Sequence, residues 1–356
     1  MDVAELDTPC LVVERSVLDG NLARMAAFFA GRPARLRPHF KSHKCTRIAL
    51  RQLAAGNSAG ITCAKLAEAE ALVRAGVRDV LIANQLAGEA KLRRLAGLNR
   101  SAEVKCCVDA AWQVESLGAA ARAAGVELGV LVELDVGMGR CGVASGGAAL
   151  ELARLTDRTG GLRFLGLQGY EGHAVLVEDA AERRKLAARA MAELLAARRL
   201  VERAGLAVSV VSSGGTGTYD LAGAAEGVDE VQAGSYALMV AKYRRVRPEF
   251  ANALFILAAV ISRTGGRAVL DVGVKGCGAE FGPPEVAGVP AGAAACRLSE
   301  EHCTVTGDVG RLAPGGRVRL IPSHGCTTCN LYRELHLVDG DQVLETWPVD
   351  GSGCVT

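Results

Sequence analysis

The sequence predicts an α/β protein: a (β/α)8 TIM barrel with a second, mostly antiparallel β-domain. Strand-like apolar runs alternate with helix-like runs up to about residue 248, which is typical of βα units around a parallel sheet. Roughly eight such units in about 240 residues match the size of a (β/α)8 barrel. Beyond residue 248 the runs are short, β-rich and separated by Gly or Asp turns. We therefore expect the barrel at residues 11–248 and the β-domain at residues 1–10 and 249–356.

The elements follow one another in a regular order. The expected barrel strands are residues 11–14, 34–41, 60–63, 80–83, 104–108, 128–135, 164–170, 208–212 and 230–233. The helices between them are an apolar stripe at residues 18–29, then residues 66–75, 88–98, 110–124, 148–156 and 179–204. The expected strands of the β-domain are residues 253–262, 268–272, 303–309, 317–321, 334–338 and 342–347. Polar and glycine-rich segments fall at the C-terminal ends of the barrel strands, where barrel active sites lie.

Composition narrows the class of protein and its compartment. Half of the 356 residues are hydrophobic, which permits a large core. A net charge of +2 and an aromatic content of 4% give no reason to expect nucleic acid or an anionic membrane as partner. The longest apolar run, residues 253–261, is too short to span a bilayer, and the N-terminus lacks a signal-peptide pattern. We expect a cytoplasmic protein whose 12 cysteines are mostly reduced.

The segment RPHFKSHK, residues 37–44, ends the second expected strand. Strand alternation places Arg37, His39 and Lys41 on one face. Neighbouring cations disfavour the ammonium form of a lysine and make its free amine available, as a Schiff-base lysine requires. The alternative interpretation is a solvated basic edge strand.

Two glycine-rich segments follow successive expected strands. The first is SGGTGTY, residues 213–219, and the second is GSY, residues 234–236. Glycines allow close approach of the backbone to an anion, and successive N–H groups can cradle a phosphate. A pair of tight turns is the alternative.

Three further side chains stand at strand ends. Arg140, in the loop of residues 135–143, can reach a ring nitrogen or a carboxylate, although a surface salt bridge would also explain it. Tyr170 can pack on a flat ring, and His173 can exchange protons near neutral pH. A hydrogen-bonded loop histidine is the alternative for His173.

A His-x-Cys motif, His324 and Cys326, lies in the expected β-domain. On an extended chain both side chains share one face. Imidazole and thiolate bind divalent metals, thiolate favours zinc, and two protein ligands suit an ion that keeps positions for water and substrate. The alternative is a hydrogen-bonded histidine and a buried thiol. Cys329 would point to the opposite face and is not counted as a ligand.

Taken together, these motifs resemble the fold-type III pyridoxal-phosphate enzymes of the D-threonine aldolase and D-serine dehydratase family, which have an alanine racemase-like N-terminal barrel. The resemblance extends from residue 7 to residue 349. The matching stretches are RPHFKSHK (37–44), GRCGV (139–143), GYEGH (169–173), SGGTGTY (213–219), QAGSY (232–236) and PSHGCTTCNLY (322–332).

The resemblance implies a cofactor, a metal and a partner. Lys41 would bind pyridoxal 5'-phosphate covalently, with His39, Arg140 and Tyr170 around it. The phosphate would be held by Ser213, Gly214, Gly215, Thr216, Gly217, Thr218, Gly234, Ser235 and Tyr236. His324 and Cys326 would hold one divalent metal, with zinc favoured over manganese. The family forms homodimers in which the β-domain of one protomer helps to build the active site of the other.

The implied reaction is retro-aldol cleavage of a small D-β-hydroxy-α-amino acid to glycine and an aldehyde. The metal would lower the pKa of the β-hydroxyl group, His173 would remove its proton, and the cofactor would accept the electrons of the broken bond. Two residues depart from the pattern. Aldolases usually carry Asp where this chain has Cys326, and D-serine dehydratases of the eukaryotic type carry Cys. Val240 stands where many relatives have Asp after Gly-Ser-Tyr. β-Elimination to a 2-oxo acid and ammonia is therefore the alternative. A non-catalytic pyridoxal-phosphate-binding homeostasis protein is a further alternative, but such proteins lack a β-domain.

Overall fold

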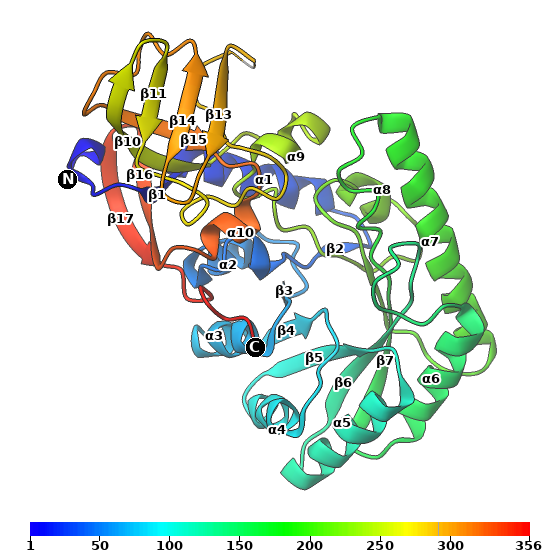
Figure 1. Ribbon diagram of the computed structural model, residues 1–356. Helices are drawn as coiled ribbons and strands as arrows, with labels where there is room; N and C mark the ends of the chain where they lie inside the picture. Colours follow the sequence, from blue (N-terminus) through cyan, green and yellow to red (C-terminus); the bar gives the residue numbers. More distant parts are fainter. Residues whose placement is uncertain (291) are drawn as a thin grey trace. The chain divides into compact units, whose positions relative to one another are not determined.

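The structure of this chain is a computed structural model that describes residues 1–290 and 292–356. It contains two compact units, shown in Figure 1. The barrel unit comprises Met25–Lys41, Ala49–Gly234 and Cys354–Thr356, and the β-unit comprises Met1–Arg24, Ser42–Ile48 and Ser235–Gly353. The domain limits of 11–248 and 249–356 stay a prediction.

The barrel unit is built on eight parallel strands. They are β2 (Arg35–Leu36), β3 (Ile61–Cys63), β4 (Asp79–Ile82), β5 (Glu103–Val108), β6 (Leu128–Glu133), β7 (Leu162–Gln168), β8 (Val210–Ser213) and β9 (Glu230–Val231). Their order is β2-β9-β8-β7-β6-β5-β4-β3. Parallel bridges from Leu36 to Ser58 and from His39 to Thr62 join the two ends of this sheet. The predicted fold class, a (β/α)8 barrel with a mostly antiparallel second sheet, is confirmed.

Helices alternate with these strands and surround them (Figure 1). They are α2 (Thr46–Ala54), α3 (Leu66–Arg74), α4 (Glu89–Leu98), α5 (Ala111–Ala124), α6 (Gly146–Arg158), α7 (Ala180–Arg203) and α8 (Tyr219–Gly223), after α1 (Arg15–Phe29). Their ends follow local chemistry: the Asp179 side chain caps α7, and Gly125 ends α5 in the left-handed region at φ 67°. Among the described residues, no helix combines the length and apolarity needed to cross a membrane.

The second sheet belongs to the β-unit. Its strands are β1 (Cys10–Glu14), β10 (Leu254–Thr264), β11 (Arg267–Leu270), β12 (Glu285–Val286), β13 (Ala294–Leu298), β14 (Cys303–Gly307), β15 (Arg317–Ile321), β16 (Glu334–Asp339) and β17 (Gln342–Pro348). The main path runs β13-β14-β11-β10-β1-β16-β17, and β15 pairs with β10 and β12. Every pairing is antiparallel except that of β1 with β16. Two short helices, α9 (Ala241–Val246) and α10 (Gly325–Cys329), lie in the same unit.

Two strand predictions need correction. Residues 11–14 do form a strand, but β1 pairs with β10 and β16 in the second sheet and not with a barrel strand. The expected strand 34–41 is reduced to Arg35–Leu36, and Phe40–Ser42 form a 3₁₀ turn. Pro38 has no N–H group to continue the ladder, which is consistent with the early end of β2. Lys41 therefore lies in a turn and not on a strand face.

A buried ion-pair network holds the short strand β2. Arg37 is 2% exposed, and its guanidinium group binds the Glu230 carboxylate through two contacts of 2.6 Å. A third contact of 2.5 Å reaches Asp79, which also accepts from Lys105 at 2.7 Å. Burial lowers the pKa of Arg37, but the charges of Glu230 and Asp79 outweigh burial and raise it. Arg37 is therefore neutralised locally, which corrects our expectation that it acts as an uncompensated cation on Lys41.

This network predicts a large effect of one carboxylate on stability. Glu230→Ala leaves the Arg37 charge buried with half of its partners, so the free energy of unfolding should fall by about 3–5 kcal/mol. Chemical denaturation of the purified protein measures the loss. Glu89→Ala, which removes the exposed partner of Arg93, is the control and should change little. Equal losses in the two variants would contradict a stabilising role for the buried pair.

Candidate active site

Lys41 lies against the ring of Tyr170 within the barrel unit. The Nζ atom of Lys41 is 5.8 Å from the centroid of this ring, and the Cζ atom of Arg140 is 5.7 Å from the same centroid. Lys41 is half-buried, and its backbone N–H donates to the Nδ1 atom of His39 at 3.4 Å. The structure thus brings together four of the residues that the sequence predicts for cofactor binding, from segments 39–41, 140 and 170.

The loop that carries Arg140 is held by an acidic residue at its start. The Asp135 carboxylate follows β6 and accepts the backbone N–H groups of Gly137, Met138 and Gly139 at 2.9–3.1 Å. Burial raises the pKa of Asp135, but these hydrogen bonds outweigh burial and lower it. The conformation of the loop is therefore fixed by its own sequence.

Arg140 itself faces a buried acid. Its Nη2 atom is 3.8 Å from the Oε1 atom of Glu133, and Gln85 donates to the other oxygen of that carboxylate at 2.5 Å. Burial raises the pKa of Glu133. This ion pair joins an exposed side chain to a buried one, because the Arg140 side chain is 48% exposed and that of Glu133 is 4% exposed.

His173 is exposed and lies beside the same loop. A Cβ atom added at Gly137 would lie 3.2 Å from the Cε1 atom of His173, so the ring packs against the glycine backbone. The nearby His173 charge also contributes to the low pKa of Asp135. The geometry therefore brings His173 to the loop of Arg140.

The segment of residues 213–218 folds around a carboxylate that the sequence analysis did not single out. Glu171 is fully buried, and its oxygens lie 3.1 Å from the Ser213 hydroxyl and 2.5 Å from the Thr218 hydroxyl. The backbone N–H group of Gly214 also donates to Glu171, at 3.2 Å. Glu171 lies between Tyr170 and His173 in the sequence, and this position was the signal that could have found it. The sequence does not show that its side chain is buried.

Close packing requires glycine at two positions of this segment. A Cβ atom at Gly217 would overlap the carbonyl oxygen of Val175. A Cβ atom at Gly215 would lie 3.2 Å from a Val175 methyl group and 3.3 Å from the Tyr170 ring. The glycines thus let the segment approach the wall that carries Tyr170.

The remaining predicted cofactor residues lie where the two units join in sequence. Gly234 ends the long segment of the barrel unit, and Ser235 and Tyr236 belong to the β-unit. The Ser235 carbonyl accepts the N–H group of Met239 at 2.8 Å. The Tyr236 ring is buried, with its centroid 5.9 Å from that of Phe250.

His324 and Cys326 lie together in the β-unit, but not on an extended chain as expected. His324 caps the short helix α10, and Cys326 is in its first turn. The Thr328 hydroxyl donates to the His324 carbonyl at 2.7 Å, which favours the helical turn. The two side chains hydrogen-bond each other, so the pairing survives the change of local structure.

A second acidic residue missed by the sequence analysis orients this pair. Glu280 is hydrogen-bonded to the Nδ1 atom of His324 and accepts the Thr327 hydroxyl at 2.6 Å. Burial lowers the pKa of His324, but Cys326 and Glu280 together raise it to about 9. Cys329 is fully buried, and burial raises the pKa of its thiol. Across residues 1–290 and 292–356, no three His, Cys, Asp or Glu side chains are grouped to hold a metal.

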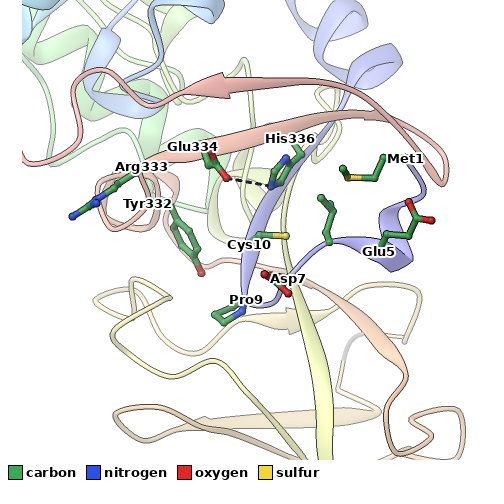
Figure 2. Close-up of a pocket in the computed structure, with 10 residues that line it drawn as sticks. Met1, Glu5, Asp7, Pro9, Cys10, Tyr332, Arg333, Glu334 and His336 are labelled. Carbon is green, nitrogen blue, oxygen red and sulfur yellow. Dashed lines mark ion pairs between the residues drawn. The ribbon is translucent and has the colours of Figure 1, made fainter.

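A surface pocket of about 400 Å³ lies elsewhere in the β-unit, as Figure 2 shows. Met1, Glu5, Cys10, Tyr332 and His336 are among its lining residues. None of the predicted site residues lines it, so it is separate from the candidate site.

Comparison with known proteins identifies the family. The model of the family "Alanine racemase, N-terminal domain" matches residues 13–242, and that of the "Putative serine dehydratase domain" matches residues 253–338. The D-threonine aldolase of Arthrobacter sp is 39% identical over 99% of this chain and 94% of that protein. The 3-hydroxy-D-aspartate aldolase of Paracoccus denitrificans (strain Pd 1222) is 36% identical with the same coverage. The crystal structure of D-threonine aldolase from Filomicrobium marinum superposes with a TM-score of 0.94, at 38% identity, covering 99% of this chain and 98% of that one.

These matches confirm the resemblance seen in the motifs. The chain has the fold of the alanine racemase-like enzymes that use pyridoxal phosphate. More narrowly, it belongs to the D-threonine aldolase and D-serine dehydratase family. The alternative of a barrel-only homeostasis protein is not supported, because the second domain is present and matched.

Gly217 provides a test of the glycine-rich segment. Gly217→Ala forces the segment away from Val175, so we expect the affinity for pyridoxal phosphate to fall by about tenfold or more. A change of this size corresponds to the loss of roughly one charge-assisted hydrogen bond to the phosphate. Equilibrium dialysis followed by absorbance measures the retained cofactor. Gly97→Ala, in α4 with open space around the position, is the matched control and should retain it fully. Equal retention in both variants would count against a cofactor role for the segment.

Proposed function

We propose that this protein is a lyase, dependent on pyridoxal phosphate and a divalent metal, that cleaves D-β-hydroxy-α-amino acids to glycine and an aldehyde. The observation that carries the proposal is the group formed by Lys41, Tyr170 and Arg140 beside the glycine-rich segment of the barrel unit. Full-length similarity to two aldolases of D-β-hydroxy amino acids supports the reaction class. The relatives differ in their named substrates, so the substrate side chain is not part of the proposal.

The residues of the barrel unit fit the cofactor. Lys41 offers a half-buried primary amine, and Tyr170 offers a flat ring beside it. Gly215 and Gly217 leave room that a Cβ atom would fill. When bound, pyridoxal phosphate supplies an electron sink for the electrons of the broken carbon–carbon bond. Lys41 would hold its aldehyde carbon, and Arg140 would lie beside the pyridine ring.

His173 is the proposed base. It is exposed, and it packs on Gly137 in the loop that also carries Arg140. Cleavage requires loss of the proton of the substrate β-hydroxyl group, and an imidazole can take a proton near neutral pH. His173 would hold that proton at a ring nitrogen while the bond breaks.

His324 and Cys326 fit a divalent metal by their donor atoms. Glu280 binds the Nδ1 atom of His324, which leaves Nε2 as the atom for the ion. A thiolate and an imidazole together favour zinc, with manganese as the alternative. The metal would lower the pKa of the substrate hydroxyl group.

The second candidate function is β-elimination to a 2-oxo acid and ammonia. Two observations favour it: a cysteine at position 326, and the match of residues 253–338 to a putative serine dehydratase domain. In this reaction Lys41 would take the Cα proton and the hydroxyl group would leave with help from the metal. The aldolase proposal is preferred because two full-length aldolase relatives are 39% and 36% identical to this chain, whereas the D-threo-3-hydroxyaspartate dehydratase of Delftia sp. (strain HT23) is 30% identical.

We also propose that the protein forms a homodimer and is located in the cytoplasm. Phe281 and Leu331, near the proposed metal pair, are large apolar side chains that stay exposed in the single chain. Exposed apolar groups beside a site with two ligands suit coverage by a second copy. Within residues 1–290 and 292–356, none of the 12 cysteines forms a disulfide bond, which suits a reducing compartment. Sedimentation of the purified protein distinguishes a dimer from a monomer.

Product analysis tests the proposed reaction. The enzyme with pyridoxal phosphate and zinc or manganese should convert D-threonine to glycine and acetaldehyde, and Lys41→Ala should lose both this activity and the visible absorbance of bound cofactor. Lys275→Ala removes an exposed lysine paired with Glu301 and serves as control. A 2-oxo acid with ammonia from D-serine, without glycine, would favour the dehydratase. A borohydride-stable cofactor bond in Lys41→Ala would show that another lysine is the site.

Metal removal tests the proposed ligands. EDTA should abolish turnover and leave the cofactor absorbance intact, because His324 and Lys41 belong to different units. His324→Ala should lose zinc, and Glu280→Ala should weaken zinc affinity about 10–100-fold, as loss of a ligand-orienting group does. Competition with a chelating dye measures both affinities. His302→Ala, at an exposed histidine of the same unit, is the control, and Cys326→Asp should keep activity. Full activity in metal-free enzyme would overturn this part of the proposal.

A further inference from the structure

We infer that Glu171 is a positioning residue that fixes the segment Ser213–Thr218 in the shape that binds the phosphate of the cofactor, so that the barrel selects pyridoxal phosphate over pyridoxal. The inference rests on the cofactor site of the proposed function. The hydrogen bonds of Glu171 go to the glycine-rich segment, and not to Lys41 or His173. Its proposed effect is exerted through the segment that it holds.

Glu171 holds the segment at both ends. At the start, one carboxylate oxygen accepts the N–H group of Gly214 at 3.2 Å and lies 3.1 Å from the Ser213 hydroxyl. At the end, the other oxygen accepts the Thr218 hydroxyl at 2.5 Å. The Thr218 oxygen in turn accepts the N–H group of Gly215 at 3.2 Å. The intervening arc is thereby fixed by a single side chain.

The burial of this carboxylate calls for an explanation. Glu171 is 0% exposed, and glutamates are almost never fully buried unless they are paired. In the described part of the chain its partners are hydroxyl and backbone N–H groups, and no salt bridge to it is found. A carboxylate that only filled space would be replaced at lower cost by an apolar side chain, since burying charge is unfavourable. Its hydrogen bonds instead specify one conformation of a segment rich in glycine.

The segment needs an external residue to fix its conformation because it is rich in glycine. Three of the four residues from 214 to 217 are glycines, which have the largest conformational freedom of any residue. Gly215 packs closely on Val175 and Tyr170, and Gly217 packs on Val175, so rigidity must come from outside the segment. Donors that are already in place bind an anion better than donors that must be ordered during binding.

The position of Glu171 also links the segment to the wall of the site. It directly follows Tyr170, whose ring lies against Lys41 and Arg140, and it precedes His173 by two residues. The Ser213 hydroxyl extends this link, because it lies 2.6 Å from the carbonyl oxygen of Gly169. The distance between the phosphate segment and the ring wall is therefore set by one residue.

The test separates positioning from general support of the fold. The protein is purified with its cofactor, stripped and titrated with pyridoxal phosphate and with pyridoxal, which lacks the phosphate group. We expect Glu171→Ala to raise the Kd for pyridoxal phosphate by about tenfold or more and the Kd for pyridoxal by less than about twofold, because only the first ligand uses the segment. Glu171→Gln preserves volume and one acceptor oxygen, so its ratio of the two Kd values should fall between those of Glu171→Ala and the parent.

Glu68→Ala is the matched control. Glu68 is also a buried glutamate of the barrel unit, but it accepts the N–H groups of Ala64 and Lys65 at the start of α3. This variant should lower the melting temperature without changing the ratio of the two Kd values. It shows what loss of a purely structural buried carboxylate does to the titrations.

The outcomes are distinct. A fall in the ratio of the Kd for pyridoxal to the Kd for pyridoxal phosphate in Glu171→Ala, with partial recovery in Glu171→Gln, supports the inference. Equal rises in both Kd values, or an unchanged ratio in a folded variant, overturn it. If Glu171→Ala does not fold, an unchanged ratio in Glu171→Gln overturns it in the same way. Absence of cofactor binding in the parent protein would instead overturn the proposed function.

Discussion

The barrel depends on the pairing of a buried guanidinium group with carboxylates from two other strands. Strand β2 has only two residues, and it is the first strand of the sheet. Arg37 follows it and binds Glu230 of β9 and Asp79 of β4. The turn that carries Lys41 begins three residues later, at Phe40. The turn that carries Lys41 is thus anchored through charges that lie outside this turn.

Carboxylates also organise the two parts of the candidate site. Asp135 and Glu171 each accept backbone N–H groups of a glycine-rich loop in the barrel unit. Glu280 plays a related role for His324 in the β-unit. Asp135 and Glu171 fix the conformation of their loops, and the exposed Glu280 fixes the orientation of the His324 ring. A chain with many glycines at its site gains order in this way without adding bulk.

The architecture could be predicted from the sequence because strand-like apolar runs alternate with helix-like runs, which is the pattern of a (β/α)8 barrel. The sequence did not predict that residues 11–14 join the other sheet, since strand partners are chosen by long-range contacts. It placed Lys41 and Cys326 on extended chain, and both lie in turns that depend on local hydrogen bonds and on Pro38. Glu171 was missed because an acidic residue shows its burial only after folding, and the exposed Glu280 was missed because it lies 44 residues from His324 in the sequence. The residues expected around the cofactor ring were nevertheless brought together, because they stand at the ends of parallel strands.

The short helix α10 is held by side chains other than the one at position 326. The helix is fastened by its threonines: Thr327 binds Glu280, and Thr328 binds the His324 carbonyl and the Gly278 N–H group. None of these bonds uses the side chain at position 326. A thiol or a carboxylate can therefore be exchanged there while the backbone keeps its course. A substitution at such a position changes the donor atom that is offered there and leaves the hydrogen bonds of the helix in place.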